Sequence, residues 1–170
     1  MAGLVLDDFI PYRLSVTSNL VSDAVARTYQ TLFGLSIPEW RIVAVLAEAG
    51  GVTQAMIGQR TRMDKVTVSR AAIALVARGL LVREAHDDRR SHGLALTPAG
   101  RELYGQVAPK ALELERQIFD GFERAEVDQF VAMLERVEAV ALALGSGGEV
   151  KAHASKRAPL HGGSRGKVEA

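Results

Sequence analysis

The chain has 170 residues, of which 48% are hydrophobic, enough apolar side chains for a folded core rather than a disordered polypeptide. It has no cysteine, which excludes disulfides, thiolate metal sites and thiol-based sensing. The chain shows no basic segment followed by an apolar run at its start and no apolar stretch near the roughly 20 residues of a membrane helix, so we expect a cytoplasmic protein without a membrane partner.

The net charge of +1 conceals an uneven layout along the chain. Residues 53–92 carry eight basic and four acidic side chains (net +4). Residues 1–52 carry three basic and five acidic (net −2), and residues 101–144 carry five and nine (net −4). A basic segment between acidic flanks favours a polyanionic partner for the middle of the chain alone.

Two helices are predicted in the first third of the chain. Apolar residues recur at helical spacing from about residue 7 to residue 33, and Gly34 follows as a typical helix terminator. Ser36 and Glu39 then have the spacing of a capping box, which predicts the start of a second helix.

A helix pair and a hairpin are predicted in the basic middle of the chain. Thr53 is a suitable N-cap for a short helix, and Asp64 is one for the longer helix that follows. Two strands of a β-hairpin are predicted at residues 81–86 and 93–96. A short helix, a longer helix and a hairpin, in this order, are typical of a winged helix-turn-helix.

Long helices are predicted at the C-terminal side. Thr97 and Pro98 predict the start of one helix, and residues 126–144 place apolar side chains on one face of another. The small central unit cannot cover the apolar faces of the first and last helices, so we expect a homodimer in which they pack against a second copy. The alternative is that these helices fold back onto their own middle.

These elements predict a mainly α fold with a small β-hairpin (α+β), in which N- and C-terminal dimerisation helices flank a winged helix-turn-helix. The glycine-rich end of the chain has few large apolar groups and is expected to be a disordered tail. We therefore divide the chain into an N-terminal dimerisation helix, a DNA-binding domain, C-terminal dimerisation helices and a tail, at residues 1–36, 37–97, 98–144 and 145–170.

Candidate DNA contacts gather on the second helix of the pair and at the turn of the hairpin. The helix offers hydrogen-bond donors and small residues on its outward side, and an arginine at a hairpin turn has the right shape for a narrow minor groove. Asp64 is better explained as a helix cap than as a residue that contacts a base. The alternative for Ser69 is a hydrogen bond to the nearby backbone, and the alternative for the hairpin turn is a solvated cluster of charges. The candidate contacts are Thr53, Gln54, Lys65, Thr67, Ser69, Arg70, Asp88, Arg89 and Arg90.

Several segments together resemble the MarR family of bacterial transcriptional regulators. Residues 63–70 (MDKVTVSR) and 75–82 (LVARGLLV) resemble its recognition helix and first wing strand. Residues 88–90 (DRR) and 94–100 (LALTPAG) resemble its wing and the start of its fifth helix, and residues 37–41 (IPEWR) resemble the start of its second helix.

The resemblance covers about residues 10–144 and implies a homodimer that grips a pseudo-palindromic operator in double-stranded DNA at the bacterial nucleoid. It implies that Arg90 is the minor-groove arginine, with Asp88 as its partner. It further implies that Thr67, Ser69 and Arg70 are the major-groove contacts.

The resemblance also implies a repressor that a small molecule releases, often an aromatic or phenolic acid or its CoA thioester, bound between the terminal helices and the winged unit. The alternative for Trp40 is a core residue, and the alternative for Arg41 is an ion pair. Ser15, Asn19 and Ser22 form a polar strip on the first helix, for which the alternative is a solvated face. The candidate effector contacts are Arg13, Ser15, Asn19, Ser22, Trp40 and Arg41.

No catalytic, cofactor or metal site is expected. The four histidines lie at the hairpin and in the tail, and none has the spacing of a metal motif or of a nucleophile and base. The rival to the ligand-responsive regulator is a ligand-independent winged-helix module for DNA binding or protein contact. Basic groups at both the helix front and the hairpin turn favour DNA as the partner.

Overall fold

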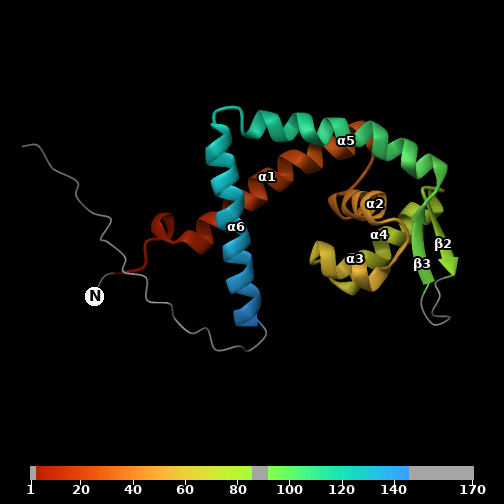
Figure 1. The fold of residues 1–170 in the computed structure, drawn as a ribbon, viewed down its shortest axis with the longest axis horizontal. Helices are drawn as coiled ribbons and strands as arrows, with labels where there is room; N and C mark the ends of the chain where they lie inside the picture. The colour runs from red at the N-terminus through yellow and green to blue at the C-terminus, as the bar shows by residue number, and fades with distance from the viewer. Residues whose placement is uncertain (1–2, 86–91, 146–170) are drawn as a thin grey trace, which may run out of the picture. The chain divides into compact units, whose positions relative to one another are not determined.

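The computed structural model describes residues 3–85 and 92–145, which form six α-helices, one short 3-10 helix and a three-stranded antiparallel sheet (Figure 1). The prediction of a mainly α fold with a small β element is confirmed. The chain divides into two compact units, residues 1–120 and residues 121–170. Among the described helices, none is both long and apolar enough to cross a bilayer.

Five helices precede the wing strands in the first unit. A 3-10 helix at Leu6–Asp8 leads into α1 at Ile10–Phe33, where sequence analysis predicted one continuous helix. The other three are α2 at Ile37–Ala49, α3 at Gln54–Thr61 and α4 at Lys65–Ala77. Packing of α2 against both α3 and α4 makes these three helices one cluster (Figure 1).

The turn between α1 and α2 follows directly from its sequence. Gly34 ends α1 with a φ of 61°, a left-handed conformation that glycine adopts without steric cost. The predicted capping box is confirmed, because Ser36 Oγ accepts from the Glu39 N–H at 3.4 Å while Glu39 Oε2 accepts from the Ser36 N–H at 2.7 Å. The direction in which α2 leaves α1 is therefore set locally.

The sheet has the order β1-β3-β2. The predicted hairpin is present as β2 at Leu81–Ala85 and β3 at His92–Leu96, with Leu81 opposite Leu96. The third strand, β1 at Val52–Thr53, pairs with β3 and was not predicted, because two residues are too few to show an alternating pattern. Through β1 the start of α3 is fixed to the hairpin.

Two long helices complete the described chain. The first, α5, runs from Pro98 to Ile118, and Thr97 Oγ1 caps it by accepting from the Gly100 N–H at 3.1 Å. Contacts with α1 and α2 attach it to the rest of the first unit. The second, α6 at Arg124–Gly145, is the described part of the second unit. The tail was predicted at residues 145–170; Gly145 is the last residue of α6, and residues 146–170 lie outside the described residues.

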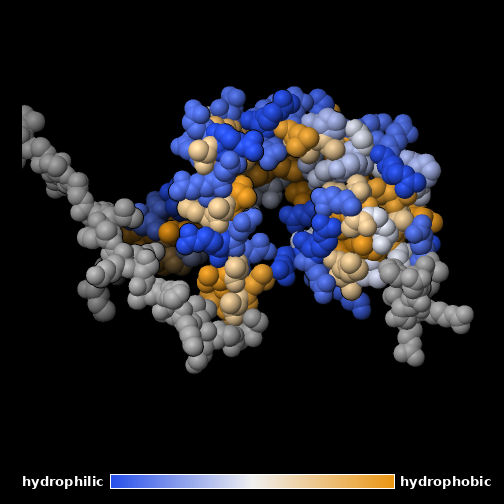
Figure 2. All heavy atoms as spheres, viewed as in Figure 1, coloured by the Kyte–Doolittle hydropathy of each residue, from blue (hydrophilic) through white to orange (hydrophobic). Residues whose placement is uncertain are grey.

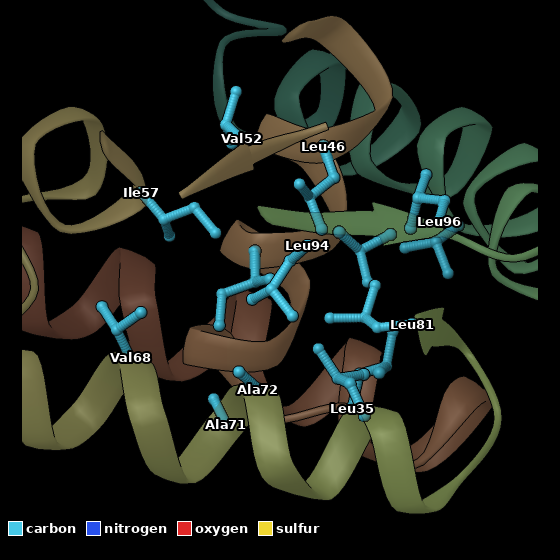
Figure 3. Packing of buried hydrophobic residues seen from close by; sticks show 14 of the residues in the cluster. Leu35, Leu46, Val52, Ile57, Val68, Ala71, Ala72, Leu81, Leu94 and Leu96 are labelled. Atoms are coloured by element: carbon cyan, nitrogen blue, oxygen red, sulfur yellow. The ribbon is translucent and has the colours of Figure 1, made fainter. Parts of the chain in front are cut away.

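The core lies between the helix cluster and the sheet (Figure 3). Buried side chains from the helices meet buried strand residues such as Leu81 and Leu94. No charged side chain is buried among the described residues, so the side chains of the core are held mainly by apolar packing. The buried helical residues include Ile42, Leu46, Ile57, Val68, Ala72 and Leu75.

Gly100 at the start of α5 is a point where the core permits no side chain. A methyl group there would overlap the backbone carbonyl oxygen of Leu80 and press on Leu96. Replacing Gly100 by alanine should therefore destabilise the fold by about 1–3 kcal/mol or more, measured by urea unfolding.

Gly105 provides the matched control for this prediction, because it lies in the same helix with open space around its Cα. Alanine at Gly105 should stabilise the fold by about 0.5–1 kcal/mol, the usual gain from replacing a glycine inside a helix. Equal effects of the two substitutions would contradict the packing described for Gly100.

Apolar side chains remain uncovered on α1 and α6. On α6 no residue is buried, and Figure 2 shows hydrophobic side chains at its C-terminal end. Large apolar residues exposed on these two helices include Ile10, Leu14, Leu20, Val131, Leu134, Val137 and Leu144.

Candidate nucleic-acid interface and effector groove

The helix pair α3 and α4 is held together by buried apolar residues, chiefly Ile57 and Val68. The turn between the helices passes through Arg62, whose φ of 57° lies in the left-handed region. A Cβ on Gly58 would lie 3.2 Å from the Met63 carbonyl oxygen, so the glycine lets the turn pass close over α3. The pair has the arrangement of a helix-turn-helix, with α4 as its second helix.

Asp64 begins α4 as the predicted cap. Its Oδ1 accepts from the backbone N–H groups of Val66 and Thr67 at 2.8 and 2.9 Å, and its Oδ2 accepts from the Thr67 hydroxyl at 2.6 Å. The hydrogen bonds from the Thr67 side chain and backbone, in that order, are the main causes that lower the pKa of this carboxyl. Asp64 thus fixes the start of the helix, and its carboxylate is already engaged.

The lowered pKa of Asp64 predicts a pH dependence of stability. A carboxyl with a folded-state pKa below its ordinary value of 3.8 contributes stability above about pH 4, and that contribution is lost as the pH falls through the folded-state pKa. The amide of Asp64→Asn still accepts a hydrogen bond but does not titrate. The variant should therefore lose less stability in acid than the wild type, measured by urea unfolding from neutral to acidic pH. Parallel pH curves for the two proteins would contradict this role.

The outward face of α4 is mixed rather than purely polar. Its buried face is formed by Val68, Ala71, Ala72 and Leu75. On the opposite face, Val66 and Ile73 are 56% and 54% exposed, with Arg70 exposed between them. Residues seven apart lie on one face of a helix, so these side chains form one strip, which we call the α4 strip (Val66, Arg70 and Ile73).

The predicted contacts of α4 lie on or beside this strip. Lys65 and Arg70 are exposed, and Thr67 and Ser69 are half-buried at its margins. Thr67 donates its hydroxyl hydrogen to Asp64, which leaves its oxygen as an acceptor. The sequence-based prediction missed Val66 and Ile73, because it considered only hydrogen-bond donors. The signal that could have identified them is their seven-residue spacing on the side of α4 opposite its buried face.

Thr53 and Gln54 lie at the N-terminus of α3. Thr53 caps that helix, since its Oγ1 accepts from the Met56 N–H at 3.3 Å, and both residues are half-buried. Asp88, Arg89 and Arg90 are outside the described residues. The two strands that lead to them are paired through five residues each, and Arg83 on β2 adds an exposed basic side chain to the wing.

Comparison with known proteins identifies this arrangement. A MarR family model matches residues 33–91. A MarR family transcriptional regulator from Silicibacter pomeroyi is 31% identical in sequence, and the match covers 81% of this chain and 95% of that one with a TM-score of 0.69. The chain belongs to the MarR family of transcriptional regulators.

Two further structures are similar over most of their length. A MarR/EmrR family regulator from Acinetobacter sp. ADP1 is 28% identical, with a TM-score of 0.76, over 81% of this chain and 98% of that one. CouR from Rhodococcus jostii RHA1, solved bound to p-coumaroyl-CoA, is 26% identical, with a TM-score of 0.71, over 79% of this chain and 95% of that one.

These matches confirm the resemblance seen in the sequence and the winged-helix fold class. The protein is a MarR family transcriptional regulator that binds DNA, and the family is not one of enzymes. By the resemblance described above, α4 corresponds to the recognition helix of this family and the hairpin of β2 and β3 to its wing.

In this MarR regulator Arg78 ties the end of the recognition helix to the turn between α1 and α2. Its Nη1 donates to the Gly34 carbonyl oxygen at 3.0 Å and its Nη2 donates to that of Phe33 at 3.2 Å. Glu39 of the capping box lies beside it, with Oε1 at 3.8 Å from Nη1. One side chain therefore joins the C-terminus of α4 to the start of α2.

A groove of about 330 Å³ lies between α2 and α3. Trp40 and Arg41, both predicted effector contacts, line it together with Glu48 and Arg60. Glu48 Oε2 and Arg60 Nη2 are 2.6 Å apart, an exposed ion pair that joins the two helices. Arg41 is exposed and forms no ion pair with any other described residue of the chain.

Trp40 is half-buried between two tyrosines. Its ring centroid lies 5.3 Å from that of Tyr29 on α1, at 56°, and 5.8 Å from that of Tyr104 on α5, stacked at 13°. The ring therefore packs against the core and also lines the groove, and its role as an effector contact stays a prediction.

The other candidate effector contacts are on α1 and line no part of this groove. Arg13, Ser15 and Asn19 are exposed and Ser22 is half-buried. Arg13 Nη1 donates to the Asp7 carbonyl oxygen at 3.4 Å. The structure of one chain brings only Trp40 and Arg41 together, and the α1 residues stay a prediction.

Proposed function

We propose that this MarR regulator is a homodimeric repressor that binds a pseudo-palindromic operator and is released by an aromatic acid or its CoA thioester. The main support for sequence-specific DNA contact is the α4 strip, which presents one arginine between two exposed apolar side chains on an otherwise well-packed helix. Contiguous apolar surface that a fold leaves exposed often marks an interaction site.

The α4 strip fits the edges of bases in a major groove. The Arg70 guanidinium suits the O6 and N7 acceptors of guanine, and Val66 and Ile73 suit the methyl groups of thymine. Lys65 and the N-terminus of α4 suit phosphates. We further assign Arg90 to the minor groove with Asp88 as its partner, and Thr67, Ser69, Arg89, Thr53 and Gln54 to supporting contacts. Each dimer would span half-sites centred about one helical turn apart.

The exposed apolar residues of α1 and α6 support the homodimer. On α6, Val131, Leu134 and Val137 follow helical spacing on one face, and each is more than a third exposed in the single chain. A second copy supplies the same apolar surface and buries both. The terminal helices then hold two recognition helices at a fixed separation.

The groove between α2 and α3 supports the effector. The indole of Trp40 offers an aromatic surface, and the unpaired Arg41 guanidinium offers a fork for a carboxylate or for the phosphates of a CoA. CouR, a relative of this chain, was solved with an aromatic acid thioester bound. The ligand class proposed here is therefore the aromatic carboxylic acids and their CoA thioesters.

The position of the groove explains how such a ligand would weaken DNA binding. Arg60 and Thr61 end α3 immediately before the turn into α4, and both line the groove. A ligand wedged there competes with the ion pair between Glu48 and Arg60 and changes the spacing of α2 and α3. Because Arg78 anchors the far end of α4, the recognition helix would tilt about that end.

Replacing Arg41 by alanine should separate effector binding from DNA binding. Loss of a charged hydrogen bond should weaken the binding of an aromatic acid by about 1.5–3 kcal/mol, or roughly tenfold or more. Operator affinity without ligand should stay unchanged. The measurement is calorimetric titration of the acid, with fluorescence anisotropy of an operator duplex. Arg27→Ala, an exposed arginine of α1 outside the groove, is the control.

A thermal-shift screen against aromatic acids and their CoA thioesters tests the proposed function itself. A true effector should stabilise the protein and also release it from operator DNA at the same concentrations. Operator binding that no member of either class alters would indicate a ligand-independent regulator and contradict the proposal.

A further inference from the structure

A second hollow, of about 490 Å³, lies where the end of α2 meets the wing strands and the start of α5. It shares no lining residue with the groove between α2 and α3. Its volume is within the range of small-molecule sites in proteins. We call it the wing hollow.

The wing hollow has an acidic group on one wall. A Cβ built on Gly51 would lie 3.2 Å from Glu84 Oε2, so the carboxylate of β2 lies over the bare backbone that follows α2. The Glu84 carboxylate neither accepts a hydrogen bond from, nor forms an ion pair with, any other residue that the structure describes. Within the described part of the chain, its oxygens are therefore available as acceptors.

A basic group also lines the wing hollow. Arg101 Nη1 donates to the Leu96 carbonyl oxygen at 2.9 Å, which holds the guanidinium beside β3 and leaves most of its five N–H donors available. Arg101 forms no ion pair with Glu84. The two opposite charges are thus both present in the lining and are not neutralised by each other.

The remaining lining includes an aromatic ring and aliphatic side chains. The ring of Tyr104 is fixed by its stacking on Trp40, and Leu46 and Ala47 line the hollow from α2. A flat ring and aliphatic side chains suit an apolar or aromatic group.

We propose that the wing hollow binds a small zwitterion, specifically an α-amino acid with an apolar or aromatic side chain. Its ammonium group would bind Glu84, its carboxylate would bind Arg101, and its side chain would pack on Tyr104 and α2. A ligand with only one charge engages only one of the two wall groups and loses the hydrogen bonds to the other, which disfavours the aromatic acids assigned to the α2–α3 groove. The two hollows therefore select different chemical classes.

Calorimetric titration of the full-length protein with L-leucine, L-phenylalanine and L-tyrosine tests this inference. At least one should bind. In Arg41→Ala, which lacks the arginine of the α2–α3 groove, it should bind about tenfold or more tightly than phenylpropanoate and phenylethylamine, which each keep only one of the two charges. Amide shifts of Gly51 and Ala95 in NMR spectra should follow the titration. Titrations to about 10 mM of L-leucine and L-phenylalanine, and of L-tyrosine to its solubility limit, without binding of any of the three would overturn the proposal.

Two variants locate the site, and a third controls for the groove. Glu84→Gln changes an exposed residue and should lower amino-acid affinity about tenfold, while Ala47→Leu should fill the hollow and abolish binding. Arg41→Ala, which removes the arginine of the α2–α3 groove, should leave the affinity unchanged. An equal loss in Arg41→Ala, or no loss in Glu84→Gln and Ala47→Leu, would overturn the assignment.

Discussion

Replacing Arg70 by alanine should weaken operator binding by about 1–3 kcal/mol, the usual value of an arginine that reads a guanine through two hydrogen bonds. Arg70 is exposed between Val66 and Ile73 on the face of α4 opposite its buried residues. The loss should be confined to operators that keep the guanine. With that base pair changed, wild type and variant should bind equally, which separates base reading from general attraction to phosphate.

Arg116→Ala is the matched control for Arg70→Ala. Arg116 is an exposed arginine in the last turn of α5, so its loss changes the net charge equally without touching α4. Operator affinity, measured by fluorescence anisotropy at one fixed salt concentration, should barely change. A similar loss for both variants would show that Arg70 contributes only charge.

Replacing Leu134 by aspartate should split the dimer and lower operator affinity by a factor of about 10² or more. A carboxylate in an apolar interface is unpaired and desolvated, at a cost of several kcal/mol. In a dimer, binding of one half-site raises the effective concentration of the second recognition helix at the other half-site, and two separate chains lose this gain. Sedimentation velocity should give the mass of one chain for the variant and of two for the wild type.

Ala139→Asp adds the same charge to the same helix on its polar side. Ala139 is exposed and lies beside Glu135 and Arg136, roughly opposite Leu134 around the helix. This variant should remain a dimer with wild-type affinity. If Leu134→Asp also stays dimeric, α6 is not the interface that we propose.

Local signals in the sequence were sufficient for most of the fold. Helix starts at Ser36, Asp64 and Thr97 follow from side chains that bond to backbone N–H groups within three residues, so a short window of sequence contains the cause. The hairpin was predicted for the same reason. β1 was missed, because Val52 and Thr53 form a strand only through pairing with β3, some 40 residues away.

The candidate site was predicted less completely, since it depends on tertiary contacts. Arg70 follows from helical spacing, and the same spacing places Val66 and Ile73 beside it, but these two were missed because only hydrogen-bond donors were sought. The Arg78 contacts join residues more than forty positions apart, so no local pattern indicates them. The wing hollow likewise combines residues from α2, the strands and α5.

The most direct test of the central claim is sequencing of genomic DNA fragments captured by the purified full-length protein from its own genome. The account predicts a few strongly enriched sites that share a pseudo-palindrome with half-sites about one helical turn apart. It also predicts that these sites are lost in Arg70→Ala and kept in Arg116→Ala. Uniform capture of DNA without a shared motif, or the same motif recovered with Arg70→Ala, would contradict it.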